Sequence, residues 1–379
     1  MLNPLALDTI DLKVKISDGK VVYAKSSGNK LRGYERMFIG KDPRELPDII
    51  PRVLSTCAQS HTFAYIKAVG NNNLDLIGNL MVSLEIIESN IKHPYAYWLP
   101  YLGGVEYEFP GGKKFRKVSH ASRKIRAIME KIGGKWPSVD YVKKGTKLSF
   151  TREELKDVIS FLESDMLGMS LQDFLGIKEL EELRGDIRYL NAEYWRAGLG
   201  RYASAWAQLD VSKIDDQGDR VLYDGTLVEV GPLAQALTFD DMIVKLHRDM
   251  GPSPLLRELA RVRVAAKLIL GLQDLEIESE GLHIRGDGIG YLESIRGVLV
   301  HQVKVKDKVV EYRVIQPTTF NASPGGALEN AVLGIPVRNY RNPWEISLAV
   351  SSLDSCFITN VEVYLDDKYL FTKRVGGFC

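Results

Sequence analysis

The chain has 379 residues, of which 45% are hydrophobic and 26% are charged, proportions that are ordinary for a soluble globular protein. Its 50 Lys and Arg residues nearly balance 49 Asp and Glu residues, and the resulting net charge of +1 gives no support for a nucleic-acid or anionic-membrane partner. No stretch of about 18 apolar residues occurs, so the sequence predicts no membrane-spanning helix.

The cysteines and the N-terminus indicate the cellular compartment. The three cysteines, Cys57, Cys356 and Cys379, form no C-x-x-C pair and no disulfide framework. The first residues lack the basic start and the long apolar core of a secretion signal. We therefore expect a cytoplasmic, reducing location.

The first predicted element is a β-hairpin over residues 10–26. Apolar residues alternate in two runs, and Asp18-Gly19 stands between them. An Asp-Gly pair between alternating runs is the strongest short signal for a tight hairpin turn. Residues 31–50 follow with a dense set of charges, and their prolines indicate turns or helix starts.

Several later segments have the apolar spacing of helices. The widest apolar stripe, at residues 74–97, predicts a helix that is buried against several neighbours in the core of a bundle. Thr151 and Glu154 offer a capping box at the start of another segment. Residues 102–116 are rich in Gly and Lys and predict a loop. The helical segments are 54–69, 74–97, 119–132, 152–165 and 254–276.

The remaining segments favour β-structure and loops. An Asp-Gly pair at 224–225 predicts a turn within a strand-like piece. Residues 317–326 predict a polar loop that is stiffened by proline near both ends. No internal repeat or low-complexity linker is present, so we expect a single domain over residues 1–379. The strand-like segments are 218–230, 298–301, 309–315 and 361–373.

The stretch 52–61 carries the most compact polar group of the chain. Cys57 and His61 are four residues apart, so a helix would place both on one face, where they could address one metal or one buried polar partner. A buried structural cysteine beside a hydrogen-bonded histidine is the simpler interpretation, because two ligands do not make a metal site. Cys356 lies in a similar setting near the other end of the chain.

Six separated segments resemble, in the same order, the large subunit of nickel–iron hydrogenases. The resemblance covers nearly the whole chain and implies a mainly helical α+β fold, with a central helical bundle and small sheets. The segments and the family patterns are 32–44 (R-G-x-E and G-R-D-P-R), 52–61 (R-x-C-G-x-C-x-x-x-H), 223–234 (D-G-x-x-x-E-V-G-P-L-A), 293–297 (E-A-P-R-G), 317–324 (P-T-T-W-N-x-S-P) and 352–356 (S-F-D-P-C).

The resemblance also shows which metal ligands are missing. In the family, four thiolates from two C-x-x-C motifs hold nickel, and two of them bridge to iron; soft thiolates suit such a centre. The matching positions here are Leu54 and Cys57 in the first motif, and Cys356 and Thr359 in the second. Half of the thiolates are absent, so we expect that the usual nickel–iron centre does not assemble.

Other positions of the family site are partly retained. Leu7 stands where the family has a glutamate proposed to pass protons. Glu35 matches a carboxylate at a structural magnesium, and Glu362 stands where the family has a histidine at that ion. This pair could hold a hard cation such as magnesium, or it could form ordinary salt bridges. His61 and Arg296 match residues that line the metal cavity.

The C-terminal tail is a further departure. Precursors of the family are cut after the C-terminal motif once metal is loaded, whereas this chain continues over residues 363–379. Because the cut is coupled to nickel insertion, we expect no cut here. The alternating residues 361–373 would then remain as a permanent part of a sheet.

These residues leave three functions open. The first is a divergent large subunit without hydrogen chemistry, which pairs with an iron–sulfur small subunit in a larger redox complex, as in complex I-type assemblies. Its former metal cavity would take a quinone or a sulfur substrate, and its location would be cytoplasmic and peripheral to a membrane complex. The second is an oxidoreductase with an altered single metal held by Cys57 and Cys356, with His61 nearby. The third is a structural or assembly protein.

Overall fold

A computed structural model gives the fold and describes residues 9–27, 33–70, 72–191 and 210–376. The chain forms two compact units, and each is assembled from stretches that are distant in the sequence. The first unit contains residues 1–34, 190–261 and 316–379, and the second contains residues 35–189 and 262–315. The single domain expected from the sequence stays a prediction.

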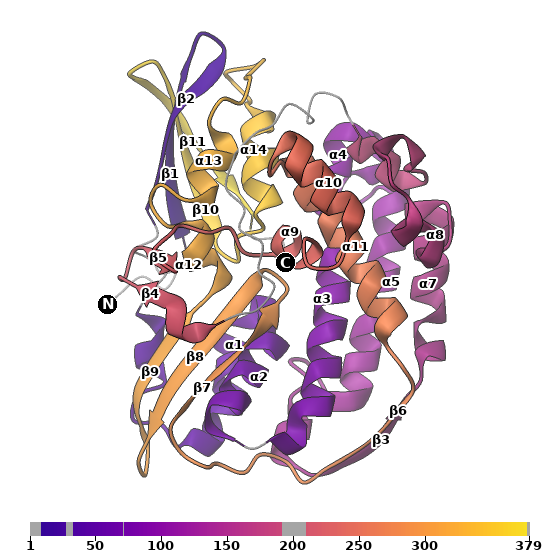
Figure 1. The fold of residues 1–379 in the computed structure, drawn as a ribbon, viewed down its shortest axis with the longest axis vertical. Helices are drawn as coiled ribbons and strands as arrows, with labels where there is room; N and C mark the ends of the chain where they lie inside the picture. The colour runs from indigo at the N-terminus through magenta and orange to yellow at the C-terminus, as the bar shows by residue number, and fades with distance from the viewer. Residues whose placement is uncertain (1–8, 28–32, 71, 192–209, 377–379) are drawn as a thin grey trace. The chain divides into compact units, whose positions relative to one another are not determined.

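A helical bundle dominates the second unit. Its longest helix, α3, packs against α2 and α5 and is buried on nearly all sides, as its wide apolar stripe predicts. Figure 1 shows α3 and α5 side by side. The helices are α1 (Leu46–Val53), α2 (Ala58–Val69), α3 (Asp75–Tyr97), α4 (Leu99–Leu102), α5 (Lys113–Gly133), α6 (Asp140–Lys143), α7 (Lys156–Phe161) and α8 (Leu171–Gly176).

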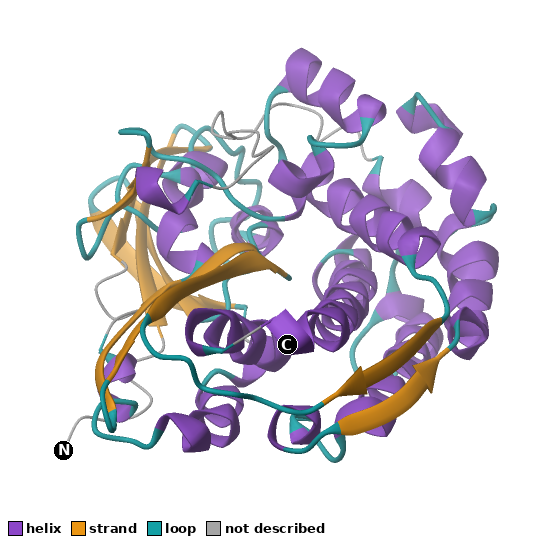
Figure 2. Cartoon of the chain, turned by 60° about the horizontal axis from the view of Figure 1, so that its bottom comes forward, coloured by secondary structure: helices purple, strands orange, loops and turns teal. Residues whose placement is uncertain are grey.

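Two small antiparallel sheets complete the second unit. β3 (Thr146–Phe150) pairs with β6 (Leu275–Ser279), and β7 (Gly288–Ser294), β8 (Gly297–Val305) and β9 (Val309–Ile315) form a meander (orange strands in Figure 2). Helix α2 lies against β7 and β8. Gly288 and Gly290 make this approach possible, since a Cβ atom at Gly290 would lie 2.0 Å from the carbonyl oxygen of Ala64.

A four-stranded sheet forms one part of the first unit. Its order is β11-β10-β1-β2, and β1 and β10 run parallel from the pair Thr9 and Ile358 to the pair Ile16 and Leu365. Figure 1 shows the C-terminal strands beside the N-terminal hairpin. The predicted hairpin and the predicted strand tail are thereby confirmed. The strands are β1 (Thr9–Ser17), β2 (Lys20–Ser27), β10 (Ile358–Leu365) and β11 (Lys368–Val375).

Short helices form the rest of the first unit. Helix α11 (Pro254–Gly271) is continuous, and the boundary between the two units falls within it, after Arg261. Its first part belongs to this unit and its second part to the other. No helix in the described ranges is both long enough and apolar enough to cross a bilayer. The other elements are β4 (Ile214–Asp216), β5 (Val221–Tyr223), α9 (Pro232–Ala236), α10 (Asp241–Met250), α12 (Pro317–Asn321), α13 (Ala327–Val332) and α14 (Trp344–Ser352).

Three predicted elements need correction at their ends or in their type. Helix α5 begins at Lys113, inside the predicted loop 102–116. The glycines of this segment all precede Lys113, so they do not interrupt the helix. The predicted turn at 224–225 is present, since Asp224 and Gly225 both have positive φ angles and Tyr223 bridges to Thr226. The predicted strand-like piece 218–230 is too long, because β5 covers only Val221–Tyr223 and pairs with the preceding strand β4. The predicted loop 317–326 begins with α12, whose residues are all buried, so tertiary packing overrides the local turn signals.

Candidate functional site

The predicted site residues are divided between the two units. His61, Arg296 and Cys57 lie in the second unit with Glu35, whereas Cys356, Thr359 and Glu362 lie in the first. The pairs Cys57–Cys356 and Glu35–Glu362 therefore stay predictions. Leu7 and Cys379 lie outside the described residues.

A break in helical structure positions Cys57. Helix α1 ends at Val53, and Leu54 and Cys57 have non-helical ψ angles of 56° and 57°. Cys57 is thus the N-cap residue of α2, only 6% exposed, with its Sγ 3.9 Å from the hydroxyl of Thr56. Because the helix begins after Cys57, the predicted continuous helix over 54–69 is wrong at its start. Cys57 and His61 do not share a face of one unbroken helix.

A buried carboxylate from α3 caps the N-terminus of α2. Glu85 accepts hydrogen bonds from the backbone N–H groups of Gln59 (2.8 Å) and Ser60 (3.0 Å), and from the Ser60 hydroxyl (2.6 Å). These N–H groups have no partner within their own helix, and the helix dipole favours an anion there. Burial nevertheless raises the pKa of Glu85 to about 7, with the three donors acting in the opposite direction.

The side chain of Gln59 ties the same turn to the segment before α6. Its Nε2 donates to the carbonyl of Pro137 and, at 3.4 Å, to that of Ser138. The hydroxyl of Tyr141 donates to its Oε1 at 3.3 Å. Gln59 is fully buried, so these contacts satisfy an amide that would otherwise oppose folding. The first turn of α2 is therefore held both by α3, through Glu85, and by the segment around the start of α6.

A chain of three hydrogen-bonded side chains runs from α2 into the β7–β8–β9 sheet. His61 Nδ1 lies 2.8 Å from His301 Nε2, and His301 Nδ1 lies 2.8 Å from the hydroxyl of Tyr312. His61 and His301 are 1% and 0% exposed. Burial lowers the pKa of His61 to about 3, with a smaller contribution from the positive charge of Arg296. Burial also lowers the pKa of His301 well below its usual range, and the neighbouring His61 acts in the same direction. Both rings are therefore neutral at pH 7.

Arg296 supplies positive charge beside this chain. It lies between β7 and β8 and is 2% exposed, and its backbone N–H donates to the hydroxyl of Ser294 at 3.4 Å. Its charge lowers the pKa of both His61 and Glu85, although burial is the larger influence on each. The second unit thus places Arg296 near both His61 and Glu85, and His301 beside His61. The role of His61 and Arg296 as cavity-lining residues stays a prediction.

Sequence reasoning missed the partners of His61 and Arg296. A glutamate within the apolar run of α3 was the available signal for Glu85, because a buried carboxylate requires donors. His301 and Tyr312 lie on inward-facing positions of strands β8 and β9. A histidine among the valines of a buried strand was the corresponding signal for His301.

In the first unit, Cys356 contacts helix α12. Its Sγ lies 3.0 Å from the hydroxyl of Thr318, and its backbone N–H donates to the same hydroxyl at 3.3 Å. The Sγ also lies 3.8 Å from Oε1 of Gln316. Thr359 is 0% exposed on the inner face of β10, and its hydroxyl has no hydrogen-bond partner among the described residues.

The two carboxylates of the predicted hard-cation site have different surroundings. Glu35 is 9% exposed and lies in the short helical turn Tyr34–Met37. Glu362 lies on the half-exposed face of β10, opposite Lys13 of β1, and accepts a hydrogen bond of 3.5 Å from Tyr364. Within the described ranges, no three His, Cys, Asp or Glu side chains are grouped as ligands for one ion.

Comparison with known proteins identifies similar chains. A family profile described as nickel-dependent hydrogenase matches residues 268–361. The large subunit of a periplasmic NiFeSe hydrogenase from Desulfomicrobium baculatum is 22% identical, over 91% of this chain and 90% of its own length. Sulfhydrogenase 2 subunit alpha of Pyrococcus furiosus is 25% identical, over 82% of each chain.

Solved structures give the same picture. The reduced, active NiFeSe hydrogenase of D. baculatum has a TM-score of 0.69 at 20% identity, covering 94% of this chain and 98% of that one. The oxidised NiFeSe hydrogenase of D. vulgaris Hildenborough has a TM-score of 0.68 at 20% identity, covering 90% and 94%. The predicted resemblance and the predicted α+β fold with helical bundle are confirmed.

Proposed function

We propose that this chain, which has the fold of nickel-hydrogenase large subunits, is a divergent large subunit that does not split hydrogen. In this proposal it pairs with an iron–sulfur small subunit in a redox complex and is peripheral to a membrane. The cysteine count is the observation that carries the proposal. Two C-x-x-C motifs need four thiolates, and the chain has three cysteines in total.

The donor atoms at the aligned positions do not fit a nickel–iron centre. Leu54 is 8% exposed and has no donor atom, and Thr359 offers a neutral hydroxyl where a bridging thiolate is needed. The third cysteine, Cys379, does not align with either missing position. The chain therefore lacks two of the four soft ligands that such a centre requires.

The retained polar residues suit a reaction that takes up protons. Reduction of a quinone or of a sulfur substrate consumes protons together with electrons, and the electrons would come from the iron–sulfur cluster of the small subunit. A neutral histidine can give a proton from one ring nitrogen while it receives one at the other. His61 would do so with His301 as its donor, and the charge of Arg296 would stabilise a reduced, anionic substrate.

Metal analysis of the protein, purified under non-denaturing conditions together with the chains that it binds, tests the proposal. We expect an iron–sulfur partner to copurify and no stoichiometric nickel to be present. Nickel at one atom per chain, with infrared bands of cyanide and carbon monoxide, would contradict the loss of hydrogen chemistry. A single zinc or iron that is lost in both Cys57→Ala and Cys356→Ala would favour the altered-metal enzyme instead.

A further inference from the structure

Helix α5 carries a basic stripe along its exposed side. The apolar side of α5 packs against α3 and α7, which leaves the other side to solvent. The basic residues recur every three or four positions and therefore follow one another along the helix surface. They are Lys113, Arg116, Lys117, His120 and Arg123. This concentration of charge is local, because the whole chain carries a net charge of only +1.

The basic stripe forms one wall of a groove of about 560 Å³. The opposite wall comes from α7 and from the π-helix Leu162–Leu167 that continues it. Phe161 contributes an apolar contact within the groove. The polar residues of the opposite wall are Asp157, Ser160, Ser164 and Asp165. We call this feature the α5–α7 groove.

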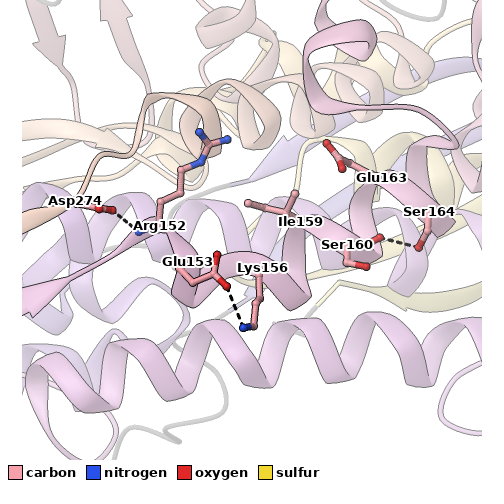
Figure 3. A pocket seen from close by; sticks show the side chains of 8 residues that line it. All are labelled: Arg152, Glu153, Lys156, Ile159, Ser160, Glu163, Ser164 and Asp274. Atoms are coloured by element: carbon pink, nitrogen blue, oxygen red, sulfur yellow. Dashed lines mark hydrogen bonds and ion pairs between the residues drawn. The ribbon is translucent and has the colours of Figure 1, made fainter.

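The other side of α7 has a pocket of different character. It has a volume of about 850 Å³ and shares Ser160 and Ser164 with the α5–α7 groove (Figure 3). Its lining has two cations, Arg152 and Lys156, and three carboxylates, Glu153, Glu163 and Asp274. Lys156 contacts Glu153 at 2.9 Å, and the backbone N–H of Arg152 donates to Asp274 at 2.7 Å. This pocket therefore offers no excess of positive charge to a ligand.

The α5–α7 groove, in contrast, retains unpaired cations. Within it, Lys117 pairs with Asp165 at 2.6 Å. Beside it, Lys124 pairs with Asp157 at 2.8 Å. Lys113, Arg116 and Arg123 are exposed and form no ion pair with any described residue. Three like charges along one helix edge repel one another, and an anionic ligand would relieve that repulsion.

Exposed apolar side chains lie in the turn before α5, close in sequence to Lys113 at the start of the basic stripe. Val105 and Phe109 precede α5 and are 72% and 62% exposed. The ring of Phe109 packs edge-on against Phe115 of the first turn of α5, with 5.0 Å between ring centroids. An exposed apolar group beside a charged groove is typical of a surface that binds another protein.

We propose that the α5–α7 groove binds an acidic polypeptide segment of a partner protein, with an apolar residue of that segment resting on Val105 and Phe109. Carboxylates of the segment would pair with Lys113, Arg116 and Arg123, where Arg offers two parallel donors. Backbone N–H groups of the same segment would face the carboxylates and hydroxyls of the α7 wall. This proposal is independent of the metal content of the protein.

A polypeptide fits the charge distribution better than an anionic bilayer does. A flat layer of phosphates would meet Asp157 and Asp165 of the α7 wall as well as the basic stripe, and these carboxylates would repel it. A peptide in a groove presents different chemical groups to the two walls, so its carboxylates face only the basic side.

Fluorescence anisotropy with the full chain tests the proposal. The probe is a labelled peptide of eight glutamates followed by leucine and phenylalanine, and a second peptide carries glutamine in place of every glutamate. We expect the acidic probe to bind, the glutamine peptide not to bind, and added salt to weaken binding. Lys113→Glu combined with Arg116→Glu and Arg123→Glu should weaken binding about tenfold or more.

A charge-matched variant distinguishes this groove from general attraction to a polyanion. Lys144→Glu, Lys306→Glu and Lys308→Glu change three exposed lysines of the same unit by the same charge, and should leave binding within about twofold. Circular dichroism and thermal melts confirm that both triple variants fold. The double variant Val105→Ser and Phe109→Ser should also weaken binding of the acidic probe. The salt dependence of that binding should not change.

Three outcomes would overturn the proposal. Equal losses of affinity for the acidic probe in the two triple variants would mean that the probe is attracted by the overall positive charge and not by this groove. An unchanged affinity in the groove variant would place binding elsewhere. If the acidic probe does not bind, and vesicles of phosphatidylcholine with phosphatidylglycerol do so only when the three cations are present, the ligand is a membrane surface.

Discussion

His61 Nδ1 and His301 Nε2 lie 2.8 Å apart in the buried interior of the second unit. Two neutral imidazoles can form this contact only if one nitrogen carries the proton and the other accepts it. The hydroxyl of Tyr312 at 2.8 Å from His301 Nδ1 extends the chain by one more group. Each histidine thereby fixes the tautomer of the other. The two hydrogen bonds must point the same way, either from Tyr312 toward His61 or from His61 toward Tyr312.

Replacing His301 should destabilise the protein. His301→Ala leaves His61 Nδ1 without its buried partner and opens a cavity, so we expect a loss of about 3 kcal/mol in the free energy of unfolding. Tyr312→Phe removes one hydroxyl at the end of the chain and should cost about 1 kcal/mol. Denaturant titration measures both values. Equal costs for the two variants would contradict the central position of His301.

The stability should fall as the pH is lowered below about 6.5. The folded pKa of His61 is about 3, below the unfolded value of 6.5, so the unfolded chain takes up a proton that the folded chain refuses. The stabilisation is present above pH 6.5 and is lost progressively toward pH 3, with a slope of up to about 1.4 kcal/mol per pH unit.

Substitutions of two histidines can separate this contribution from other titrating groups. His61→Gln should reduce the slope of unfolding free energy between pH 6 and about 4. His120→Gln is the matched control, because His120 is exposed on α5 and lies outside the hydrogen-bonded chain of His61, His301 and Tyr312. An identical slope in the His61 variant and the parent protein would mean that His61 titrates normally in the folded state.

Glu85 should give a pH dependence of opposite sign. Its folded pKa of about 7 exceeds its ordinary value of 4.5, so the folded state holds a proton that the unfolded state releases. The resulting stabilisation is fully present below pH 4.5 and is lost as the pH rises through 7. Glu85→Gln should remove that dependence between pH 5 and about 8, at a cost of about 1–2 kcal/mol for the weaker cap of α2. A dependence that survives the substitution would assign it to another group.

Gly290→Ala should strongly destabilise the contact between α2 and β7. The added Cβ would lie 2.0 Å from the carbonyl oxygen of Ala64, so the helix and the strand must separate. We expect a cost of about 3 kcal/mol in the free energy of unfolding. Gly176→Ala is the control, because no heavy atom lies within 4 Å of its Cβ position, and it should be close to neutral. Similar costs for the two variants would contradict the close approach.

Local chemistry explains which elements are predictable from the sequence. Asp18 and Gly19 both adopt positive φ angles of 49° and 75°, which is what a tight hairpin turn requires, and the alternating runs beside them follow. Thr151 and Glu154 form the predicted capping box. In each case the signal and the structure lie within a few residues of each other.

The missed features depend on contacts between distant residues. Strand β7 was not predicted because Gly288 and Gly290 have low strand propensity. Their role is to let α2 pack closely against the strand, and that contact cannot be inferred from the local sequence. Helix α12 is buried for a comparable reason. Glu85 caps a helix that begins 27 residues earlier in the chain, so no local pattern links the two. The resemblance located His61 and Arg296 but not these partners.

The pairing of β1 with β10 has a consequence for how the protein is made. Thr9 pairs with Ile358, so nearly the whole chain separates two neighbouring strands of one sheet. A ribosome releases β1 long before β10, and until then the first hairpin presents an unpaired edge to other chains. Contacts this distant in sequence also slow folding. The first unit therefore completes its sheet only after synthesis has passed residue 358, and we expect chaperones to hold the nascent hairpin until that moment.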